Sequence, residues 1–267
     1  MLHKITSPAN PLVKTLKSLH GKKGRGETGL FLAEGARLAT EAADLGVWPE
    51  ILAFAPAAFD RPAVARLIER ADKAGVRCVE TKEAVLGQIA RRDNPQMIVS
   101  AYRRLDTSLS RLDVRKPKLW IGLERVRDPG NLGTILRTAD AAGAGGVILI
   151  GETCDPFSVE TVRASMGAIF ATPFAETDLA GFAAWRKKNG LRAIGTSLRG
   201  TARHDEPSAE GAIVLMLGNE QSGLTDEGEA ACDSLVKIPM AGKADSLNLA
   251  AAAAVILYDF WRRRGYA

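Results

Sequence analysis

The chain of 267 residues has few residues of the types that form disulfides or bind metals. Its three cysteines are Cys78, Cys154 and Cys232, which lie far apart, and none of its three histidines is closely spaced with a cysteine or another histidine. Neither an even set of disulfides nor a Cys/His zinc cluster can be made from these residues. We therefore expect reduced thiols and no metal.

A long apolar run is also missing. The longest, Leu247 to Tyr258, is interrupted by Asn248 and falls short of the roughly 20 residues that cross a bilayer. The first residues, MLHKITSPANPLVK, include two lysines but neither an apolar core nor a cleavage pattern of small residues. We expect a buried helix at residues 247–258, no membrane association and a cytoplasmic protein.

Three motifs of common enzyme classes are absent. The GNLG sequence at Gly130 and Gly133 lacks the GxGxxG spacing, no GKS or GKT triplet occurs, and no GxSxG occurs. These absences argue against a Rossmann dinucleotide site, a Walker phosphate loop and a Ser-His-Asp hydrolase.

What the chain does contain is a large apolar fraction, 46%, and a formal net charge of +5. The first feature supports folded cores, and the second is compatible with a polyanionic partner. Basic residues gather in residues 1–30, where Glu27 is the single acid. Two interpretations are open, a solvated tail or a surface that contacts phosphates. The candidate phosphate-contacting residues of this basic cluster are Lys14, Lys17, Lys22, Lys23 and Arg25.

Residues 1–108 are predicted to form a small α/β domain. The runs FLAEG, ILAFA, VRCVE and QMIVSAY are typical of strands, and the amphipathic stretches between them are typical of helices. The polar segment RRLDTSLSRLDVRKPK follows, with the composition of an exposed connection. We therefore expect two domains, residues 1–108 and 109–267.

The second domain is predicted to be a three-layer α/β fold with a mostly parallel sheet. Its runs LWIGL, GVILIG, LRAIGTS, AIVLMLG and LVKIPM show little alternation, as in strands covered on both faces. Helical stretches lie between or after them, including DPFSVETVRASMG. This repeated order of strand and helix favours a parallel sheet.

Three of the loops that follow these strands combine glycine or proline with small polar residues. They are RDPGNLGTILRTADAAG, LGNEQSGLTDE and IPMAGKADSLNLA. Ligands of parallel sheets bind beyond the carboxyl ends of strands, so these loops are candidate site segments. Each also has a structural explanation: Asp128 can begin a helix, Asp245 or Ser246 can cap one, and Glu220 can be a solvated acid.

In this order, the three loops resemble the signature motifs of the SpoU (TrmH-like) branch of the SPOUT RNA methyltransferases. The motifs appear as DPGNLGTILRTADAAG, LMLGNEQSGL and KIPMAGKADSLNLAAAAAVIL, and the resemblance covers roughly residues 115–263. The segment from NPLVKTLKSL to IVSAY resembles the L30e-like substrate-binding domain of many members. Gln221 departs from the glycine common at its position, and Leu249-Ala250 departs from the commoner Val-Ser.

The resemblance implies an S-adenosylmethionine-dependent 2′-O-ribose methyltransferase, a C-terminal trefoil knot and a homodimer. Its catalytic polar positions correspond to Asn131, Arg137, Glu220, Ser246 and Asn248. Its cofactor contacts correspond to Leu217, Gly218, Ile238, Met240 and Leu247. Ribosomal RNA is the expected substrate. A tRNA target, base methylation and a non-catalytic RNA-binding protein are the alternatives.

The acceptor of the hydroxyl proton stays open. A guanidinium remains protonated in proteins, so we expect Arg137 to bind an RNA phosphate and to stabilise the developing alkoxide. Proton removal is then assisted by that phosphate or by water, while an arginine base is the alternative that has been discussed for the family.

Overall fold

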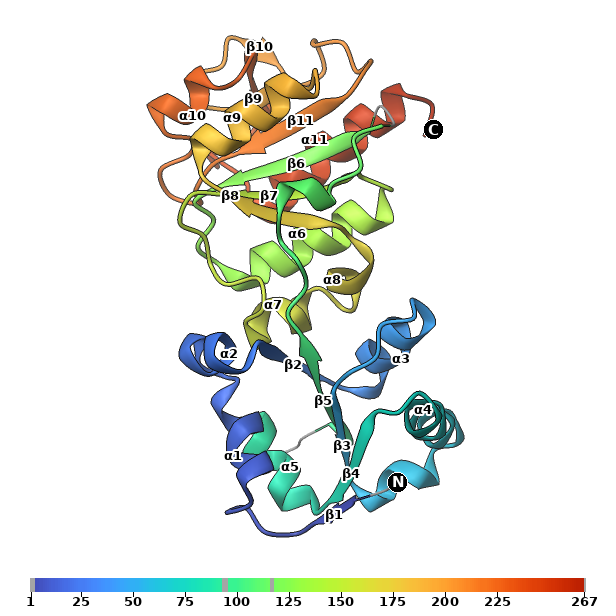
Figure 1. Cartoon of the computed structure of the whole chain (residues 1–267). Helices are drawn as coiled ribbons and strands as arrows, with labels where there is room; N and C mark the ends of the chain where they lie inside the picture. The colour runs from blue at the N-terminus through green and yellow to red at the C-terminus, as the bar shows by residue number, and fades with distance from the viewer. Residues whose placement is uncertain (1–2, 93–95, 116–117, 267) are drawn as a thin grey trace. The chain divides into compact units, whose positions relative to one another are not determined.

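The computed structural model describes residues 3–92, 96–115 and 118–266, and the chain packs into two compact units (Figure 1). The first unit contains Met1–Leu105 and Asp155–Ala171, and the second contains Asp106–Cys154 and Thr172–Ala267. Both are α/β units, as expected from the alternating apolar runs and amphipathic stretches.

The first unit is built on a mixed five-stranded sheet in the order β1-β4-β3-β5-β2. Strand β5 is antiparallel to β2 and β3, whereas β1 and β3 pair with β4 in parallel. The strands are β1 (His3–Ile5), β2 (Leu30–Glu34), β3 (Ile51–Phe54), β4 (Arg77–Thr81) and β5 (Ile98–Arg103). The last four coincide with the four apolar runs of the sequence, and β1 has no such run.

Helices cover both faces of this sheet. Buried residues of α1 and α5 form one core with the sheet, and those of α3 and α4 form a second core. The helices in the N-terminal segment of this unit are α1 (Pro11–Ser18), α2 (Lys22–Thr28), α3 (Ala36–Asp44), η1 (Pro56–Asp60), α4 (Pro62–Lys73) and α5 (Glu83–Ala90). Helix α1 begins at Pro11 because the Asn10 side chain accepts a hydrogen bond from the Leu12 N–H at 2.9 Å.

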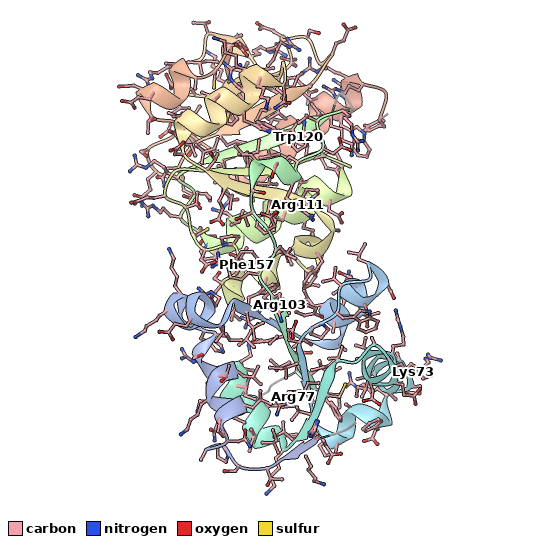
Figure 2. All side chains as sticks on the ribbon, viewed as in Figure 1. Lys73, Arg77, Arg103, Arg111, Trp120 and Phe157 are labelled. Atoms are coloured by element: carbon pink, nitrogen blue, oxygen red, sulfur yellow. The ribbon has the colours of Figure 1, made fainter. Side chains whose placement is uncertain are left out.

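Residues 155–171 belong to the first unit although they lie between two strands of the second. They carry α7 (Val159–Ala164) and α8 (Ala168–Ala171), and the ring of Phe157 lies 5.1 Å from that of Phe31 (Figure 2). The sequence predicts DPFSVETVRASMG as part of the second domain, whereas the structure packs it in the first unit. Its apolar residues predict a buried face, but that pattern does not specify which sheet buries it.

The second unit is built on a seven-stranded sheet in the order β10-β12-β9-β11-β6-β7-β8, and every pairing among these strands is parallel. The strands are β6 (Leu119–Glu124), β7 (Gly146–Ile150), β8 (Phe174–Thr177), β9 (Arg192–Thr196), β10 (Ala202–Arg203), β11 (Ile213–Leu217) and β12 (Ser234–Lys237). The predicted parallel sheet is confirmed, and β8 and β10 add to the five expected strands.

Helices lie on both faces of this sheet, as the three-layer prediction requires (Figure 1). Phe182 of α9 packs with Trp120 and Met216 on one face, where Trp120 also meets Trp185 edge to face (Figure 2). On the other face, α6 and α11 pack on each other and contact β6, β7 and β11. The elements are η2 (Leu109–Arg111), α6 (Pro129–Ala141), α9 (Leu179–Lys188), α10 (Asp226–Ala230) and α11 (Leu249–Arg263). No helix in the described part of the chain is long and apolar enough to span a bilayer.

Candidate active site

The three signature loops meet at one edge of the second sheet. They follow β6, β11 and β12, and these strands lie in the middle of the sheet in the order β12-β9-β11-β6. Because these strands are parallel, the loops after all of them leave the sheet at the same edge. The loop after β9 therefore joins the other three, and it is the one that the sequence analysis does not single out.

These loops surround a cavity of about 390 Å³. Its volume lies within the range of about 300–1,000 Å³ that is common for small-molecule sites. All five residues predicted to contact the cofactor line it, namely Leu217, Gly218, Ile238, Met240 and Leu247. Of the five predicted catalytic residues, Glu220 and Ser246 line it as well.

The Glu220 carboxylate connects the loop after β11 to the loop after β6. It accepts hydrogen bonds from the backbone N–H of Arg127 at 3.2 Å and of Asp128 at 3.1 Å. It also accepts hydrogen bonds from the side-chain amides of Asn131 at 3.2 Å and Asn219 at 3.3 Å. Glu220 is therefore a positioning residue that fixes donors of the first loop, and it is not an idle solvated acid.

Asn131 extends the same network to the third loop. Its Oδ1 accepts a hydrogen bond of 2.9 Å from Nδ2 of Asn248. Asn248 is also the N-cap of α11, because its Oδ1 accepts hydrogen bonds from the N–H groups of Ala250 and Ala251. The cap expected at Asp245 or Ser246 therefore lies at Asn248. The expected helix start at Asp128 is confirmed, since its side chain accepts from the Asn131 N–H at 2.6 Å.

The network keeps Glu220 charged. Burial raises the pKa of the Glu220 carboxyl, but hydrogen bonds from its own N–H, from Asp128, Asn131 and Arg127 outweigh burial. The net result is a pKa below its ordinary value. The charged form is the one that accepts from all these donors, so the ionised carboxylate and the arrangement of the loops stabilise each other.

The loop after β11 turns too tightly for a side chain at its first position. A Cβ on Gly218 would lie 1.9 Å from the backbone carbon of Gly223. Asn219 and Gly223 exchange backbone hydrogen bonds of 2.9 Å, and Gly223 has a φ of +69°. The GNEQSG sequence thus forms a closed turn that presents backbone to the cavity.

The loop after β9 brings further polar residues to the cavity. Ser197 donates a hydrogen bond of 2.6 Å to Glu229, and Arg199 forms ion pairs with Glu229 at 2.8 Å and Asp226 at 2.7 Å. Ser197, Arg199 and Glu229 all line the cavity. The GTSLRG sequence carries glycines and hydroxyls after an apolar run, but it does not reveal that β9 lies between β11 and β12.

Arg137 lies apart from the other predicted catalytic residues of its own chain. It is exposed on α6, does not line the cavity, and forms no hydrogen bond or ion pair with the described residues. Its guanidinium is therefore free to meet a ligand or another protein chain. Within one chain, the structure joins Asn131, Glu220 and Asn248 but does not bring Arg137 to them.

The basic cluster lies on α1 and α2 of the first unit. Lys14, Lys22 and Lys23 are exposed, and Lys17 is partly buried and donates a hydrogen bond of 3.3 Å to Gln88. The phosphate-binding role expected of Arg25 does not agree with its position.

The Arg25 side chain is only 5% exposed. Its guanidinium binds Asp155 at 2.7 Å and also donates to the carbonyl oxygens of Leu19 and His20. These partners occupy its donors, so Arg25 holds residues 155–171 in the first unit and is not exposed to RNA.

Comparison with known proteins agrees with this geometry. Residues 118–258 match the model of the SpoU rRNA Methylase family, and residues 10–100 match the MRM3-like substrate binding domain. The 23S rRNA (guanosine(2553)-2′-O)-methyltransferase RlmP of Bacillus subtilis (strain 168) is 33% identical over 258 residues, which cover 96% of this chain and 98% of the relative.

Solved structures give the same result over nearly the whole chain. The crystal structure of an AdoMet-bound rRNA methyltransferase from Sinorhizobium meliloti has a TM-score of 0.90 and 42% identity, covering 98% of each chain. The SpoU methyltransferase AviRb from Streptomyces viridochromogenes, in complex with AdoMet, has a TM-score of 0.83 and 30% identity, covering 96% of this chain and 98% of that one. The resemblance of the three loops is confirmed, and the chain belongs to the SpoU rRNA methylase family.

Proposed function

We propose that the protein methylates a ribose 2′-hydroxyl in ribosomal RNA, with S-adenosylmethionine as the methyl donor. The observation that carries this proposal is the hydrogen-bonded set Glu220, Asn131 and Asn248, which joins three loops around a cavity of about 390 Å³. Relatives named as 23S rRNA 2′-O-methyltransferases support the substrate class, which favours the cytoplasm as the location.

The cavity fits the proposed methyl donor. Leu217, Ile238 and Leu247 offer apolar surface, and Gly218 lines the cavity as well. Ser197 and Glu229 offer polar groups that suit ribose hydroxyls. When bound, S-adenosylmethionine supplies a methyl group that is activated by the sulfonium charge.

In the proposed reaction, the ribose 2′-oxygen forms a bond to the methyl carbon while the bond from carbon to sulfur breaks. The hydroxyl proton leaves to an RNA phosphate or to water. Arg137 is proposed to bind a phosphate of the RNA and to stabilise the charge that develops on the 2′-oxygen. Glu220, Asn131 and Asn248 hold the loops in the reactive arrangement.

We propose that the protein acts as a homodimer in which Arg137 of one copy serves the cavity of the other. Arg137 is exposed, does not line the cavity of its own chain and has no partner among the described residues. Helix α11 packs on α6 and presents Val255 and Tyr258, which are 40% and 41% exposed. Light scattering at assay concentrations tests the dimer, and a monomer that is fully active would contradict it.

Two finer features of the fold are proposed from the family resemblance. The first is a trefoil knot from β11 to α11. The second is an L30e-like fold in an RNA-binding domain of residues 1–108, to which residues 155–171 add, followed by a catalytic domain formed by the rest of residues 109–267. The pairing of β12 with β9 and the packing of α11 on α6, β6 and β11 support the knot, because the last segment must return across the sheet. The small residues Ala250–Ala254 permit close packing in α11.

The experiment that tests the function is mapping of ribose methylation in ribosomal and transfer RNA from a deletion strain and its complemented parent. One ribosomal ribose should lose its 2′-O-methyl group on deletion and regain it with the intact gene. A lost base methyl group, or a change confined to transfer RNA, would replace the proposal with the corresponding alternative. For a non-catalytic RNA-binding protein, neither methylation nor thermal stabilisation by S-adenosylmethionine is expected.

A further inference from the structure

Glu34, at the end of β2, is a buried carboxylate that is only partly paired. Its side chain is 3% exposed, and its Oε2 accepts a hydrogen bond of 2.9 Å from Arg163. Arg92 lies farther away, with its Nε 3.8 Å from the same oxygen. The other carboxylate oxygen, Oε1, is buried and has no hydrogen-bond partner among the described residues, and neither does Nε of Arg163. One acceptor atom of Glu34 and one donor atom of Arg163 are therefore left without a hydrogen bond from the residues that the structure describes.

Glu34 and Arg163 are among the residues that line a cavity of about 220 Å³ within the first unit. Its polar lining residues include Glu34, Arg37, Arg92, Gln96 and Arg163. The cavity also touches the start of α3, where the N-cap Gly35 offers no side chain to the first N–H groups of the helix. The rim side chains of Arg37, Arg92 and Gln96 are exposed.

The charges around the cavity restrict what it can bind. A phosphate inside would face the Glu34 carboxylate, and a cation would face the guanidinium groups of Arg92 and Arg163. A neutral planar group that carries both N–H donors and a carbonyl acceptor satisfies both kinds of charge. The volume is below the range of about 300–1,000 Å³ for complete small-molecule ligands, so the cavity suits one base of a larger ligand.

A second cavity connects this site to the basic cluster. It has a volume of about 780 Å³ and shares Arg92 and Gln96 with the smaller cavity. Its lining also includes Arg91 and Gln88, and Gln88 accepts the hydrogen bond from Lys17. A strand of RNA whose backbone passes these cations would bring a base to Glu34.

We propose that the cavity at Glu34 binds an unpaired guanine of the substrate RNA, at a position distinct from the methylated ribose. Guanine has two adjacent N–H donors, N1–H and the 2-amino group, which match a carboxylate, and O6 accepts from an arginine. This inference rests on the proposed function only in taking RNA as the ligand. It adds a base-specific subsite to the first unit.

The test measures binding of the full-length protein, without methyl donor, to short single-stranded RNAs of one length. Each is a uridine tract with one central guanosine, inosine, adenosine or cytidine, and fluorescence anisotropy gives the affinity. The guanosine RNA should bind at least about tenfold more tightly than the adenosine and cytidine RNAs. Inosine, which lacks the 2-amino group, should fall between them. Equal binding of the four RNAs would overturn the proposal.

Variants separate base recognition from a structural role of Glu34. Glu34→Gln should remove the preference for guanosine while S-adenosylmethionine binding and the melting temperature of the second unit stay unchanged. Because Glu34 also pairs with Arg163, Arg92→Ala at the exposed rim provides a second variant that leaves the core intact. It should reduce the preference severalfold, and a preference that survives in Arg92→Ala and in folded Glu34→Gln would overturn the proposal.

The outcome is independent of the catalytic assignment. If ribosomal RNA is methylated normally but the four RNAs bind equally, only the guanine subsite fails. If guanosine is preferred but no methyl group is transferred, the proposed function fails and the subsite stands.

Discussion

Nδ2 of Asn248 donates a hydrogen bond of 2.9 Å to Oδ1 of Asn131, although 117 residues separate the two in the sequence. Asn131 in turn donates to Glu220. Each of the three signature loops therefore contributes one member to a chain of hydrogen bonds. Since the loops follow different strands, this chain fixes their spacing at the edge of the sheet.

Asn248→Asp tests the link between the first and third loops. Aspartate keeps the oxygen that caps α11, but it places an oxygen opposite Oδ1 of Asn131 and removes the donor. We expect methyl transfer to fall about tenfold or more, because misplaced loops no longer hold the reacting groups in line. Asn10→Asp, at the N-cap of α1, is the matched control and should leave activity unchanged.

Glu220→Gln tests the charged network through its pH dependence. The folded protein lowers the pKa of Glu220 below its ordinary value of 4.5, so this carboxylate stabilises the fold above pH 4.5. That stabilisation is lost as the pH falls through the lowered folded pKa. In urea titrations, the stability gap between the wild type and Glu220→Gln should therefore narrow below pH 4.5. A gap that does not change with pH would show that the charge of Glu220 adds nothing.

Gly218→Ala tests the tight turn at the cavity. The added methyl group would lie 1.9 Å from the backbone carbon of Gly223, so the turn must open. We expect loss of S-adenosylmethionine binding in calorimetry and a lower melting temperature. Gly242→Ala, in the third signature loop, is the control because a Cβ there meets nothing within 4 Å. Normal binding in Gly218→Ala would mean that the turn relaxes without affecting the cavity.

Arg137→Ala should abolish turnover and leave S-adenosylmethionine binding nearly intact, because Arg137 does not line the cavity of its own chain. Arg137→Lys keeps the positive charge but replaces the planar guanidinium group with an ammonium group. Retained activity in this variant would show that the charge alone is sufficient for the role of Arg137. Mixing inactive Arg137→Ala with the weakened Asn248→Asp variant tests sharing between subunits, with Asn248→Asp alone as the baseline. Recovery of part of the activity in the mixture is expected if one copy supplies Arg137 to the other.

Replacing Lys14, Lys22 and Lys23 with glutamine should weaken RNA binding and flatten its salt dependence. Each lost phosphate contact reduces the slope of log K against log salt by about 0.7–0.9. Lys73→Gln, on the exposed end of α4, is the control and should leave the slope unchanged (Figure 2). An unchanged slope in the triple variant would show that these lysines serve solubility.

The strands that could be predicted are those whose apolar runs are nearly continuous. Residues 119–124 and 213–217 are buried throughout. Side chains on both faces of these strands are therefore covered, as a continuous apolar run predicts. The two residues of β10 and the three of β1 are too short to leave such a pattern. Pattern alone also did not assign residues 155–171 to the first unit, because an apolar face does not name its partner.

The site was predictable to the extent that its residues follow strands. Glu220, Asn131 and Asn248 each belong to a loop with an unusual sequence, and the structure joins them. Ser197 was missed because its position at the cavity depends on β9 lying between β11 and β12. Local sequence patterns do not predict the order of strands in a sheet. Arg25 was assigned to RNA because a charge count does not reveal that Asp155 neutralises it.

Residues 155–171 lie between two segments of the second unit but belong to the first, and this limits where the gene can be divided. A fragment that ends after residue 108 would lack Asp155 and Phe157, so Arg25 would lose its carboxylate partner and Phe31 one of its aromatic neighbours. The complementary fragment would carry Phe157 without Phe31 beside it. The first unit therefore cannot be exchanged as one continuous N-terminal segment, because residues 155–171 must be carried along with it.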